Sequence, residues 1–226
     1  MKISISRSKG AEAAVNSTGG HLSTRDRVLE VACELFSEVG FHGTHLREIC
    51  KRAGTNVAGV CYHFHDKQGL YQAVVMEAGR RLSDYDEGLV FSQHLPPEER
   101  LQKFVESLLT KLNADGAWIA KLLARELVNP ACGARNYAVS GLERNFILLQ
   151  SALRQLHGDN SEAIRLHTLS LISECVFYSL AGENQEHPLI QLAAPLPNRS
   201  RLARLITQRS LGSLDMNGAK PEVSQP

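Results

Sequence analysis

The sequence predicts an all-α protein, and three observations carry that prediction. Apolar residues recur at intervals of three and four along most of the chain, which gives a helix one buried face. Glycine, proline and asparagine stand where these runs stop, as they do at helix ends. The alternating pattern of a half-buried strand is absent. We expect a three-helix N-terminal domain at 21–70 and a larger C-terminal helical bundle at 71–214.

The N-terminal domain is predicted to follow a flexible tail. Residues 1–20 are rich in Ser, Gly, Ala, Asn and Thr, so they cannot bury enough apolar surface to offset the entropy of ordering. Ser23 or Thr24 can cap a first helix that ends at Gly40. Its predicted inward face comprises Val28, Ala32, Leu35, Phe36 and Val39.

Two short helices are expected next, joined by a tight turn. Thr44 is the predicted N-cap of the first and Gly54 ends it, while Asn56 caps the second, Val57 to about Phe64. The small Cys50, the turn glycine and the apolar Val60 would let the two helices cross closely, as in a helix-turn-helix that reads the DNA major groove. Unrelated helical hairpins share this spacing, so the pattern alone leaves both interpretations open.

Longer amphipathic helices are expected beyond Lys67. Their predicted ranges are 67–87, 97–113, 115–129, 134–157, 161–182 and 199–212. Pro96-Pro97, Asn129-Pro130, Gly158-Asp159 and the proline-containing loop 183–198 mark their boundaries. The segment 215–226 is again poor in apolar residues and is predicted to be a second flexible tail.

Composition limits the classes of function. The net charge of +1 argues against a nonspecific nucleic-acid binder of the histone type, whereas a sequence-specific binder needs only a local basic surface. The 5 cysteines form no C-x-x-C pair, which fits a reducing compartment. Neither a signal-peptide h-region nor an apolar run long enough to span a membrane is present, so we expect a cytoplasmic protein. No nucleophile elbow, phosphate-binding loop, zinc-protease motif or dinucleotide fingerprint occurs, so we expect neither an enzyme nor a cofactor.

The region from Thr24 to about Met76 resembles the DNA-binding domain of the TetR/AcrR family of bacterial repressors. The matching blocks are the run from Ala32 to Thr44, then LREICKRAG, then YHF-x-x-K-x-x-LY from Tyr62 to Tyr71. Segments within 122–130, 170–182 and 202–214 resemble the C-terminal domain of the branch that contains a regulator of cefoperazone and chloramphenicol sensitivity. The resemblance implies an all-α fold in which three N-terminal helices read DNA and the C-terminal bundle dimerises and binds an inducer.

The resemblance also implies which residues contact DNA. Matched to phosphate-contacting or base-contacting positions of the family are Thr44, Arg47, Asn56, Val57, Ala58, Cys61, Tyr62, His63 and Lys67. Many relatives carry a tyrosine where this chain has Cys61, and Val57, Ala58 and Gly59 offer almost no hydrogen bonds to bases. We therefore expect thymine methyl contacts, close backbone approach and DNA shape to carry more of the specificity.

Two other roles are open to residues in this region. His63 and His65, with His42 and His45 nearby, could suggest a metal site, but side chains two apart on a helix diverge, so we expect no metal. Cys61 could be a redox switch, although a small neutral residue at the DNA face is the simpler interpretation. Phe64 is expected in the core.

Apolar residues of the bundle could form its core, a ligand pocket or a dimer seam, and periodicity does not separate these. The predicted pocket-lining residues are Phe104, Leu108, Trp118, Leu122, Arg125, Glu126, Phe146 and Tyr178. Arg125 and Glu126 stand out as charged residues in an apolar helix: they could anchor a ligand, or pair with each other or lie at the surface. By resemblance, the last two long helices form the dimer seam, with candidates Ile164, Leu171, Cys175, Leu202, Leu205 and Ile206.

The sequence thus supports a homodimeric, ligand-responsive repressor that binds a palindromic double-stranded DNA operator and is released by a small-molecule inducer. Relatives of the C-terminal branch often govern exporter or membrane-fusion genes. A helical binding or scaffold protein whose N-terminal domain has lost its DNA contacts is the competing hypothesis.

Overall fold

The computed structural model describes residues 23–84, 94–129, 131, 135–158, 160–192 and 195–215, and its regular elements there are all helices. The predicted all-α class is confirmed. The elements are α1 (Thr24–Gly43), α2 (Leu46–Ala53), α3 (Val57–Phe64), α4 (Lys67–Ser83), α6 (Pro97–Leu112), the 3₁₀ helix η1 (Ala114–Ala117), α7 (Trp118–Val128), α8 (Arg135–His157), α9 (Ser161–Glu183), α10 (Pro188–Gln191) and α11 (Arg199–Asp215). The predicted tails, apart from Asp215, lie outside the described residues.

The N-terminal helices begin and end where side-chain caps and glycines direct them. The Ser23 hydroxyl accepts the Asp26 N–H at 3.1 Å, which confirms the predicted cap of α1. Gly40, with φ 76° and ψ 176°, interrupts α1. Four of the five predicted inward residues are buried or packed against the core, but Val39 is 50% exposed because it lies in the last turn before this interruption.

The long helices differ from the predicted ranges at two places. α4 ends at Ser83 rather than at residue 87, because the Lys111 ammonium donates to the carbonyls of Leu82 (3.1 Å) and Asp84 (2.5 Å) at its end. The predicted helix 115–129 is preceded by a left-handed turn in which Asp115, Gly116 and Ala117 all have positive φ, so α7 begins only at Trp118. α10 is a short helix inside the predicted loop 183–198.

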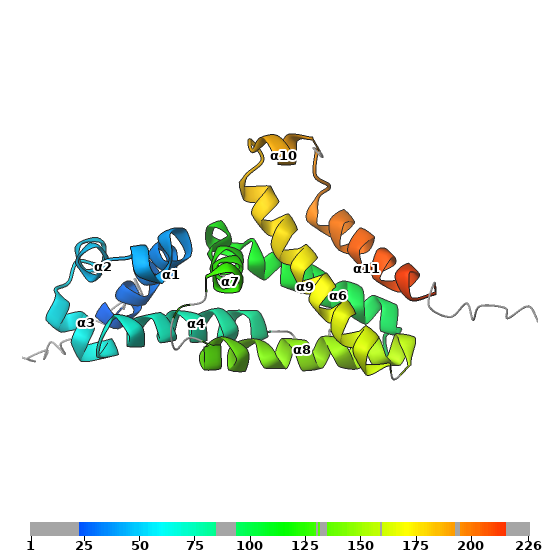
Figure 1. The fold of residues 1–226 in the computed structure, drawn as a ribbon, viewed down its shortest axis with the longest axis horizontal. Coiled ribbons are helices and arrows are strands. Elements are labelled where there is room, and N and C mark those ends of the chain that lie inside the picture. The colour runs from blue at the N-terminus through cyan, green and yellow to red at the C-terminus, as the bar shows by residue number, and fades with distance from the viewer. Residues whose placement is uncertain are drawn as a thin grey trace, which may run out of the picture.

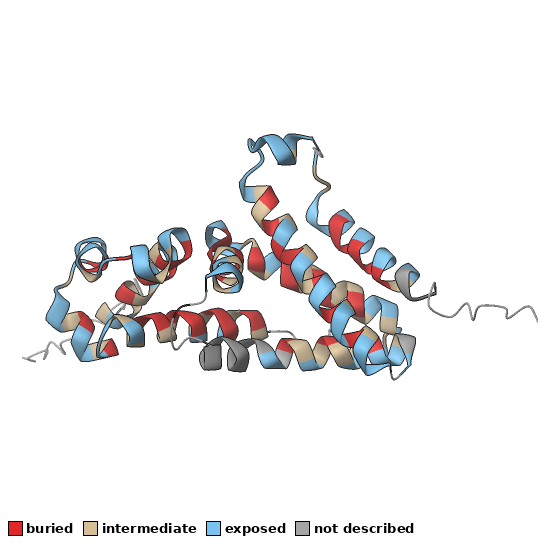
Figure 2. Cartoon of the chain, viewed as in Figure 1, coloured by how far each residue is buried: buried red, intermediate tan, exposed pale blue. Residues whose placement is uncertain are grey.

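The arrangement is elongated, with the N-terminal domain at one end (Figure 1). α4 leaves that domain and packs along α8, while α6 packs against α8, α9 and α11. α7 lies against α1 on one side and α9 on the other, so it is the helix of the bundle that contacts the N-terminal domain most closely. Half of the residues of α2 and of α3, and most of those of α10, are exposed (Figure 2).

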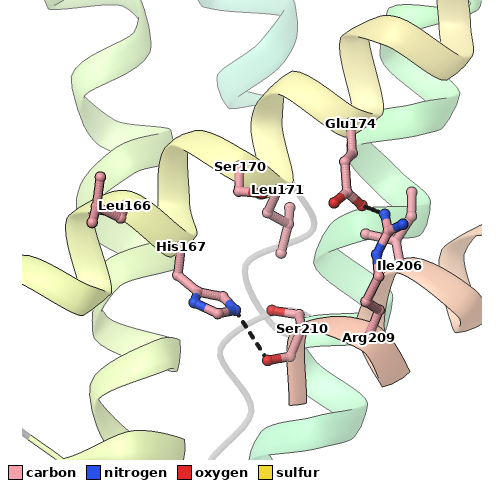
Figure 3. A pocket seen from close by; sticks show the side chains of 8 residues that line it. All are labelled: Leu166, His167, Ser170, Leu171, Glu174, Ile206, Arg209 and Ser210. Carbon is pink, nitrogen blue, oxygen red and sulfur yellow. Dashed lines mark hydrogen bonds and ion pairs between the residues drawn. The ribbon is translucent and has the colours of Figure 1, made fainter. Parts of the chain in front are cut away.

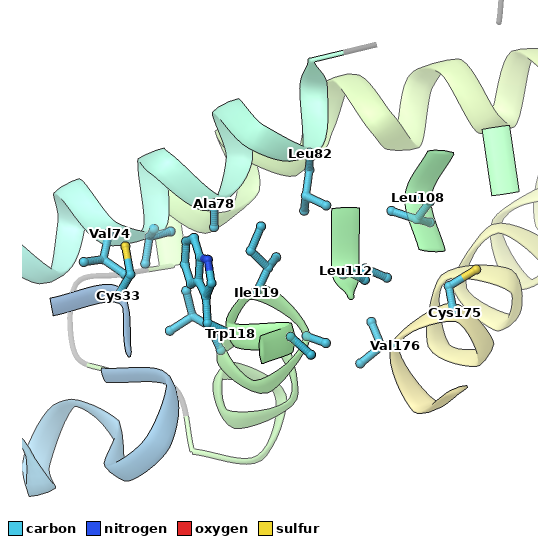
Figure 4. Packing of buried hydrophobic residues seen from close by; sticks show 14 of the residues in the cluster. Cys33, Val74, Ala78, Leu82, Leu108, Leu112, Trp118, Ile119, Cys175 and Val176 are labelled. Atoms are coloured by element: carbon cyan, nitrogen blue, oxygen red, sulfur yellow. The ribbon is translucent and has the colours of Figure 1, made fainter. Parts of the chain in front are cut away.

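One apolar core runs through both parts of the molecule. Trp118, 4% exposed, lies near Cys33 of α1 and Ala78 of α4, and Leu112 continues the packing towards Cys175 and Val176 of α9 (Figure 4). Burial raises the pKa of the Cys33 thiol to about 12, so this cysteine is a packing residue. The N-terminal domain and the bundle therefore share one apolar core and are not joined by a linker alone.

We expect Gly69→Ala to destabilise the junction of α3 and α4. A Cβ at Gly69 would lie 2.1 Å from the Phe64 carbonyl oxygen, which is backbone and cannot move aside cheaply. The loss in unfolding free energy should be about 1–3 kcal/mol in urea denaturation. Gly212→Ala is the matched control, since a Cβ there meets nothing within 4 Å and alanine favours the helix. Equal stability of the two variants would contradict the junction described here.

Candidate DNA interface

The turn between α2 and α3 has the geometry of a helix-turn-helix. Gly54 takes the left-handed conformation, with φ 64° and ψ 42°, as predicted for the end of α2. The Thr55 N–H donates to the Cys50 carbonyl at 3.0 Å, which closes the turn. Cys50 and Val60 are 5% and 0% exposed, so the small and apolar residues meet where the sequence predicted.

α3 divides cleanly into a buried and an exposed side. Val60 and Phe64 are buried, whereas Val57, Ala58 and Cys61 are exposed, as the predicted base-facing row requires. The Asn56 side-chain oxygen accepts the Gly59 N–H at 2.8 Å, which confirms Asn56 as the N-cap. The exposed row of this helix is thus small and mostly apolar.

Aromatic contacts arrange the polar residues at the end of α3. Tyr62 is 83% exposed and its ring lies edge-on to that of His63, with centroids 5.0 Å apart. The Lys67 ammonium lies over the Phe41 ring, 4.7 Å from its centroid, and partial burial lowers the pKa of Lys67. Tyr62, His63 and Lys67 therefore follow one another along the end of α3 and the start of α4.

Thr44 does not cap α2, contrary to the sequence prediction. The N-cap of α2 is His45, which makes no side-chain capping bond, and Thr44 is 1% exposed. Its hydroxyl donates to the Gly40 carbonyl at 2.8 Å, and its backbone N–H donates to the same carbonyl at 3.2 Å. Both donors of Thr44 are therefore used within the protein, where they stabilise the segment between α1 and α2. For this reason we do not retain Thr44 as a phosphate contact.

Cations of this region fall into two groups. Arg27 donates to the Ala53 carbonyl at 3.3 Å and Arg52 pairs with Glu34, so both join α1 to α2. Arg47 and Lys51 are exposed on α2. Arg25 is also exposed, and its guanidinium lies 5.3 Å from the centre of the Phe64 ring. Sequence reasoning did not select Arg25, because its place beside α3 follows from the fold and not from any local spacing.

The eight predicted pocket residues are not among those that line the cavity described between α9 and α11. Phe104, Leu108, Trp118 and Leu122 are 2–4% exposed and belong to the core, while Phe146 and Tyr178 are partly buried. That cavity has a volume of about 300 Å³ (Figure 3). Its lining residues are Leu166, His167, Ser170, Leu171, Glu174, Ile206, Arg209 and Ser210.

Arg125 and Glu126 do not pair with each other. Arg125 donates to backbone carbonyls of α1, and Glu126 accepts the hydroxyl of Tyr71 on α4. Arg125 therefore contacts the N-terminal domain, and Glu126 contacts the helix that leads out of it. The sequence could not indicate either contact, because these partners lie far away along the chain.

Most of the predicted seam residues are buried within this one chain. Ile164, Leu171, Cys175, Leu202 and Ile206 are 0–9% exposed, and only Leu205 among the six candidates is exposed, at 47%. Exposed apolar residues of α9 are Leu166, Leu169 and Phe177, at 52–62%. Helical periodicity thus identified the residues of α9 and α11 that face the core. The exposed apolar residues of α9 occupy other positions, which periodicity did not single out.

Features of a metal site and of a membrane-spanning helix are absent from the part of the chain that the structure describes. Among the described residues, no group of three His, Cys, Asp or Glu side chains is arranged to hold a metal ion. In that same part of the chain, no helix is both long enough and apolar enough to cross a bilayer. The thiols of Cys33, Cys50, Cys61 and Cys175 are free.

Two protein families match the chain. Residues 28–74 match the family described as bacterial regulatory proteins, tetR family, which spans α1 to the first half of α4. Residues 97–214 match the family described as the C-terminal domain of the HTH-type transcriptional dual regulator CecR, which spans α6 to α11.

Curated relatives resemble mainly the N-terminal part. The probable HTH-type transcriptional regulator YttP of Bacillus subtilis (strain 168) is 46% identical over 56 residues, which are 25% of this chain and 27% of that protein. The HTH-type transcriptional regulator UidR of Escherichia coli (strain K12) is 29% identical over 115 residues, 49% of this chain and 56% of that protein. The chain thus spans about a quarter and about half of the length of these relatives. The matched families and relatives are regulators of transcription, which agrees with the prediction that the chain is not an enzyme.

Solved structures share the fold over most of the chain. The fatty acid degradation regulator FadR from Bacillus halodurans has a TM-score of 0.64 at 19% identity and covers 84% of this chain and 96% of its own. HlyIIR, a hemolysin II transcriptional regulator, has a TM-score of 0.61 at 21% identity and covers 81% of this chain and 97% of its own. At these identities the likeness establishes a common fold.

We expect Asn56→Ala to lower the unfolding free energy by about 1 kcal/mol, because the Gly59 N–H loses its acceptor. Asn56→Asp keeps an acceptor at the same place and should retain wild-type stability. Urea denaturation followed by circular dichroism measures both. If the two variants lose equal stability, the cap does not stabilise α3.

Proposed function

The chain belongs to the TetR family of bacterial regulatory proteins and carries a C-terminal domain of the CecR type, and from this premise we propose that it is a homodimeric transcriptional repressor. It binds a palindromic operator on double-stranded DNA through α2 and α3 of each subunit, in the cytoplasm. A small molecule that binds the C-terminal domain releases it. The regulated genes encode exporters or stress functions.

The exposure pattern of α3 is the observation that carries this proposal. Val57, Ala58, Cys61 and Tyr62 are exposed on a helix held from beneath by Val60 and Phe64. A capped eight-residue helix with its outer side free is what a major groove accommodates. Small side chains at this side allow close approach to the bases and contact with thymine methyl groups.

Phosphate contacts on the two sides of α3 would fix its position in the groove. Arg47 lies exposed on α2, and His63 and Lys67 follow at the other end of α3. Arg25, next to Phe64, adds a further cation from α1. Such contacts position a protein on DNA, whereas the base-facing row reads the sequence.

The outward apolar residues of α9 and α11 support the homodimer. Leu166, Leu169, Phe177 and Leu205 are exposed, and Leu166 also lines the cavity between the two helices. A second copy of the chain that brings the same residues against them would bury these side chains in a four-helix seam. The residues buried within one chain, such as Leu171, would then support the seam from behind.

The side chains in the interior of the bundle indicate the chemical class of the inducer. Phe104, Leu108 and Leu122 would offer a small molecule mainly apolar surface, so the inducer is expected to be hydrophobic. Because these side chains are packed in the core, binding requires the bundle to open around the ligand, which gives the bound state a different shape from the free state.

We expect the wild-type protein to bind a DNA segment flanking its own gene with a Kd of about 10⁻⁸ M or tighter, with steep salt dependence. Arg47→Ala should weaken binding about tenfold or more, because Arg47 is exposed on α2 and matches a family position that contacts phosphate or a base. His63→Ala and Lys67→Ala should each weaken binding less, and Lys67→Ala should reduce the log–log salt slope by about 1.

Fluorescence anisotropy at several salt concentrations measures these values. Lys103→Ala, which removes a cation of α6, is the matched control and should leave both affinity and slope unchanged. Unchanged binding by both His63→Ala and Lys67→Ala would refute the docking of α3 proposed here.

The homodimer is tested at the exposed face of α9. Leu166→Asp should convert the dimer to a monomer, because a charge would be buried in the seam. Leu127→Asp, on the exposed end of α7, is the control and should remain dimeric. Light scattering after size exclusion measures the mass, and a dimeric Leu166→Asp protein would exclude this seam.

A further inference from the structure

Two adjacent charged residues of α7 contact α1 of the N-terminal domain and α4, the helix that leads out of it. α7 belongs to the bundle, and most of its residues up to Ala124 are apolar. Arg125 and Glu126 follow in its last turn, and Leu127 and Val128 beyond them are 79% and 87% exposed. The last turn of α7 therefore offers the N-terminal domain a polar contact rather than an apolar one.

Arg125 holds the end of α1. Its Nε donates to the Ser37 carbonyl at 2.7 Å, and its Nη2 donates to the Glu38 carbonyl. These carbonyls lie in the turn before Gly40, where α1 is interrupted. Carbonyls at a helix end lack N–H partners and carry the negative end of the helix dipole, so a guanidinium is well matched to them.

Glu126 holds α4. Its Oε1 accepts the Tyr71 hydroxyl and also the Ala131 N–H, the latter at 3.2 Å. The Tyr71 ring is 3% exposed and lies edge-on to Phe36 and Phe41, with centroid distances of 4.9 and 5.2 Å. Burial, and then the neighbouring Glu126, raises the pKa of Tyr71 well above its usual value, so the hydroxyl keeps its proton and remains a donor.

A short chain of contacts leads from Glu126 to the proposed DNA face. Tyr71 contacts Phe41, and the Phe41 ring carries the Lys67 ammonium at 4.7 Å. Lys67 begins α4 directly after α3, and it is one of the proposed phosphate contacts. A displacement at the end of α7 would thus act within three contacts on a residue at the DNA face.

Because of the order of the helices along the chain, these two contacts reach both sides of the helix-turn-helix. α1 leads into α2, and α4 follows α3, so α1 and α4 are the two flanks of the helix-turn-helix. Both flanks are bonded to neighbouring residues of one helix of the bundle. The other end of α7 is anchored in the core by Trp118, 4% exposed, with the Arg81 guanidinium 5.4 Å from its ring centre.

We propose that Arg125 and Glu126 are positioning residues: together they form a two-point clamp through which α7 sets the orientation of the helix-turn-helix on the C-terminal domain. A change in the bundle that displaces the last turn of α7 breaks the clamp and frees that orientation. This inference rests on the proposed function, because it names the contact that links the bundle to DNA binding.

The clamp is suited to this role because the strength of a hydrogen bond falls steeply as its distance and angle depart from the ideal. An 11-residue helix is about 16 Å long, so a small tilt about the Trp118 end moves Arg125 by an ångström or more. Such a shift is enough to lose both carbonyl contacts, whereas apolar packing nearby would change little.

The first test needs no DNA. Nitroxide labels on the exposed Cys61 and on Lys103→Cys, with Cys132→Ser and labelled chains diluted in unlabelled protein, report the distance between the two domains by pulsed electron resonance. Arg125→Met with Tyr71→Phe removes the donors at both points of the clamp; phenylalanine keeps the buried ring of Tyr71, and methionine keeps most of the length of the exposed Arg125 side chain. This double variant should give a broader or shifted distance distribution, and Lys121→Met, which removes a neighbouring cation of α7, should match the wild type. An unchanged distribution in the double variant overturns the clamp.

The second test separates orientation from stability. Inserting one base pair between the operator half-sites should sharply weaken wild-type binding. The double variant should bind the natural spacing about tenfold more weakly, as expected if the competent orientation is populated about a tenth of the time, and should be less sensitive to the insertion. Arg125→Lys, which keeps the charge and one donor group, should fall between the two.

The outcomes distinguish the two proposals. If the double variant keeps the wild-type ratio of affinities for the two spacings, the clamp is wrong while the repressor function stands. If the wild-type protein binds no DNA specifically, the proposed function is wrong, and the distance measurement still decides whether Arg125 and Tyr71 fix the orientation. Circular dichroism of each variant confirms that it is folded.

Discussion

The contact of Phe36 with Tyr71 is the constraint on which the rest of the N-terminal domain depends. Phe36 is 0% exposed on α1, and Tyr71 of α4 meets it edge-on at 4.9 Å. α2 and α3 have 8 residues each, too few to be stable alone in water, so they hold their shape because α1 and α4 are fixed against each other. An aromatic pair of this geometry adds about 0.5–1.5 kcal/mol beyond the burial of its surface.

Because the exposed side chains of α3 are small and mostly apolar, DNA binding by this helix is sensitive to the orientation of the N-terminal domain. Val57, Ala58 and Cys61 offer the bases few hydrogen bonds, so in the proposed complex they contribute specificity mainly by fitting closely. A close fit is lost when the helix is displaced slightly in the groove. In the proposed complex, operator recognition would therefore depend strongly on residues that do not touch DNA, Tyr71 and Arg125 among them.

Local signals in the sequence predicted local structure well. Ser23, Gly54 and Asn56 cap or end their helices as predicted, because capping depends on a few neighbouring backbone groups. The pocket and seam were harder to locate: periodicity identifies an inward face, and Leu108 or Leu171 fits a core, a pocket wall or a seam equally well. Arg125 was recognised as unusual, but its partners are carbonyls, and backbone groups leave no trace in the pattern of side chains.

Gly40 shows how one position can serve two parts of the molecule. Its φ of 76° with ψ 176° is open almost only to glycine, and a Cβ there would meet nothing closer than the Arg125 guanidinium at 3.8 Å, an ordinary contact. Glycine is thus required by the backbone and not by space. The interruption turns the chain towards α2, where Thr44 bonds back to the Gly40 carbonyl, and it ends the helical turn whose carbonyls Arg125 holds. The start of the helix-turn-helix and its attachment to the bundle consequently depend on the same backbone conformation.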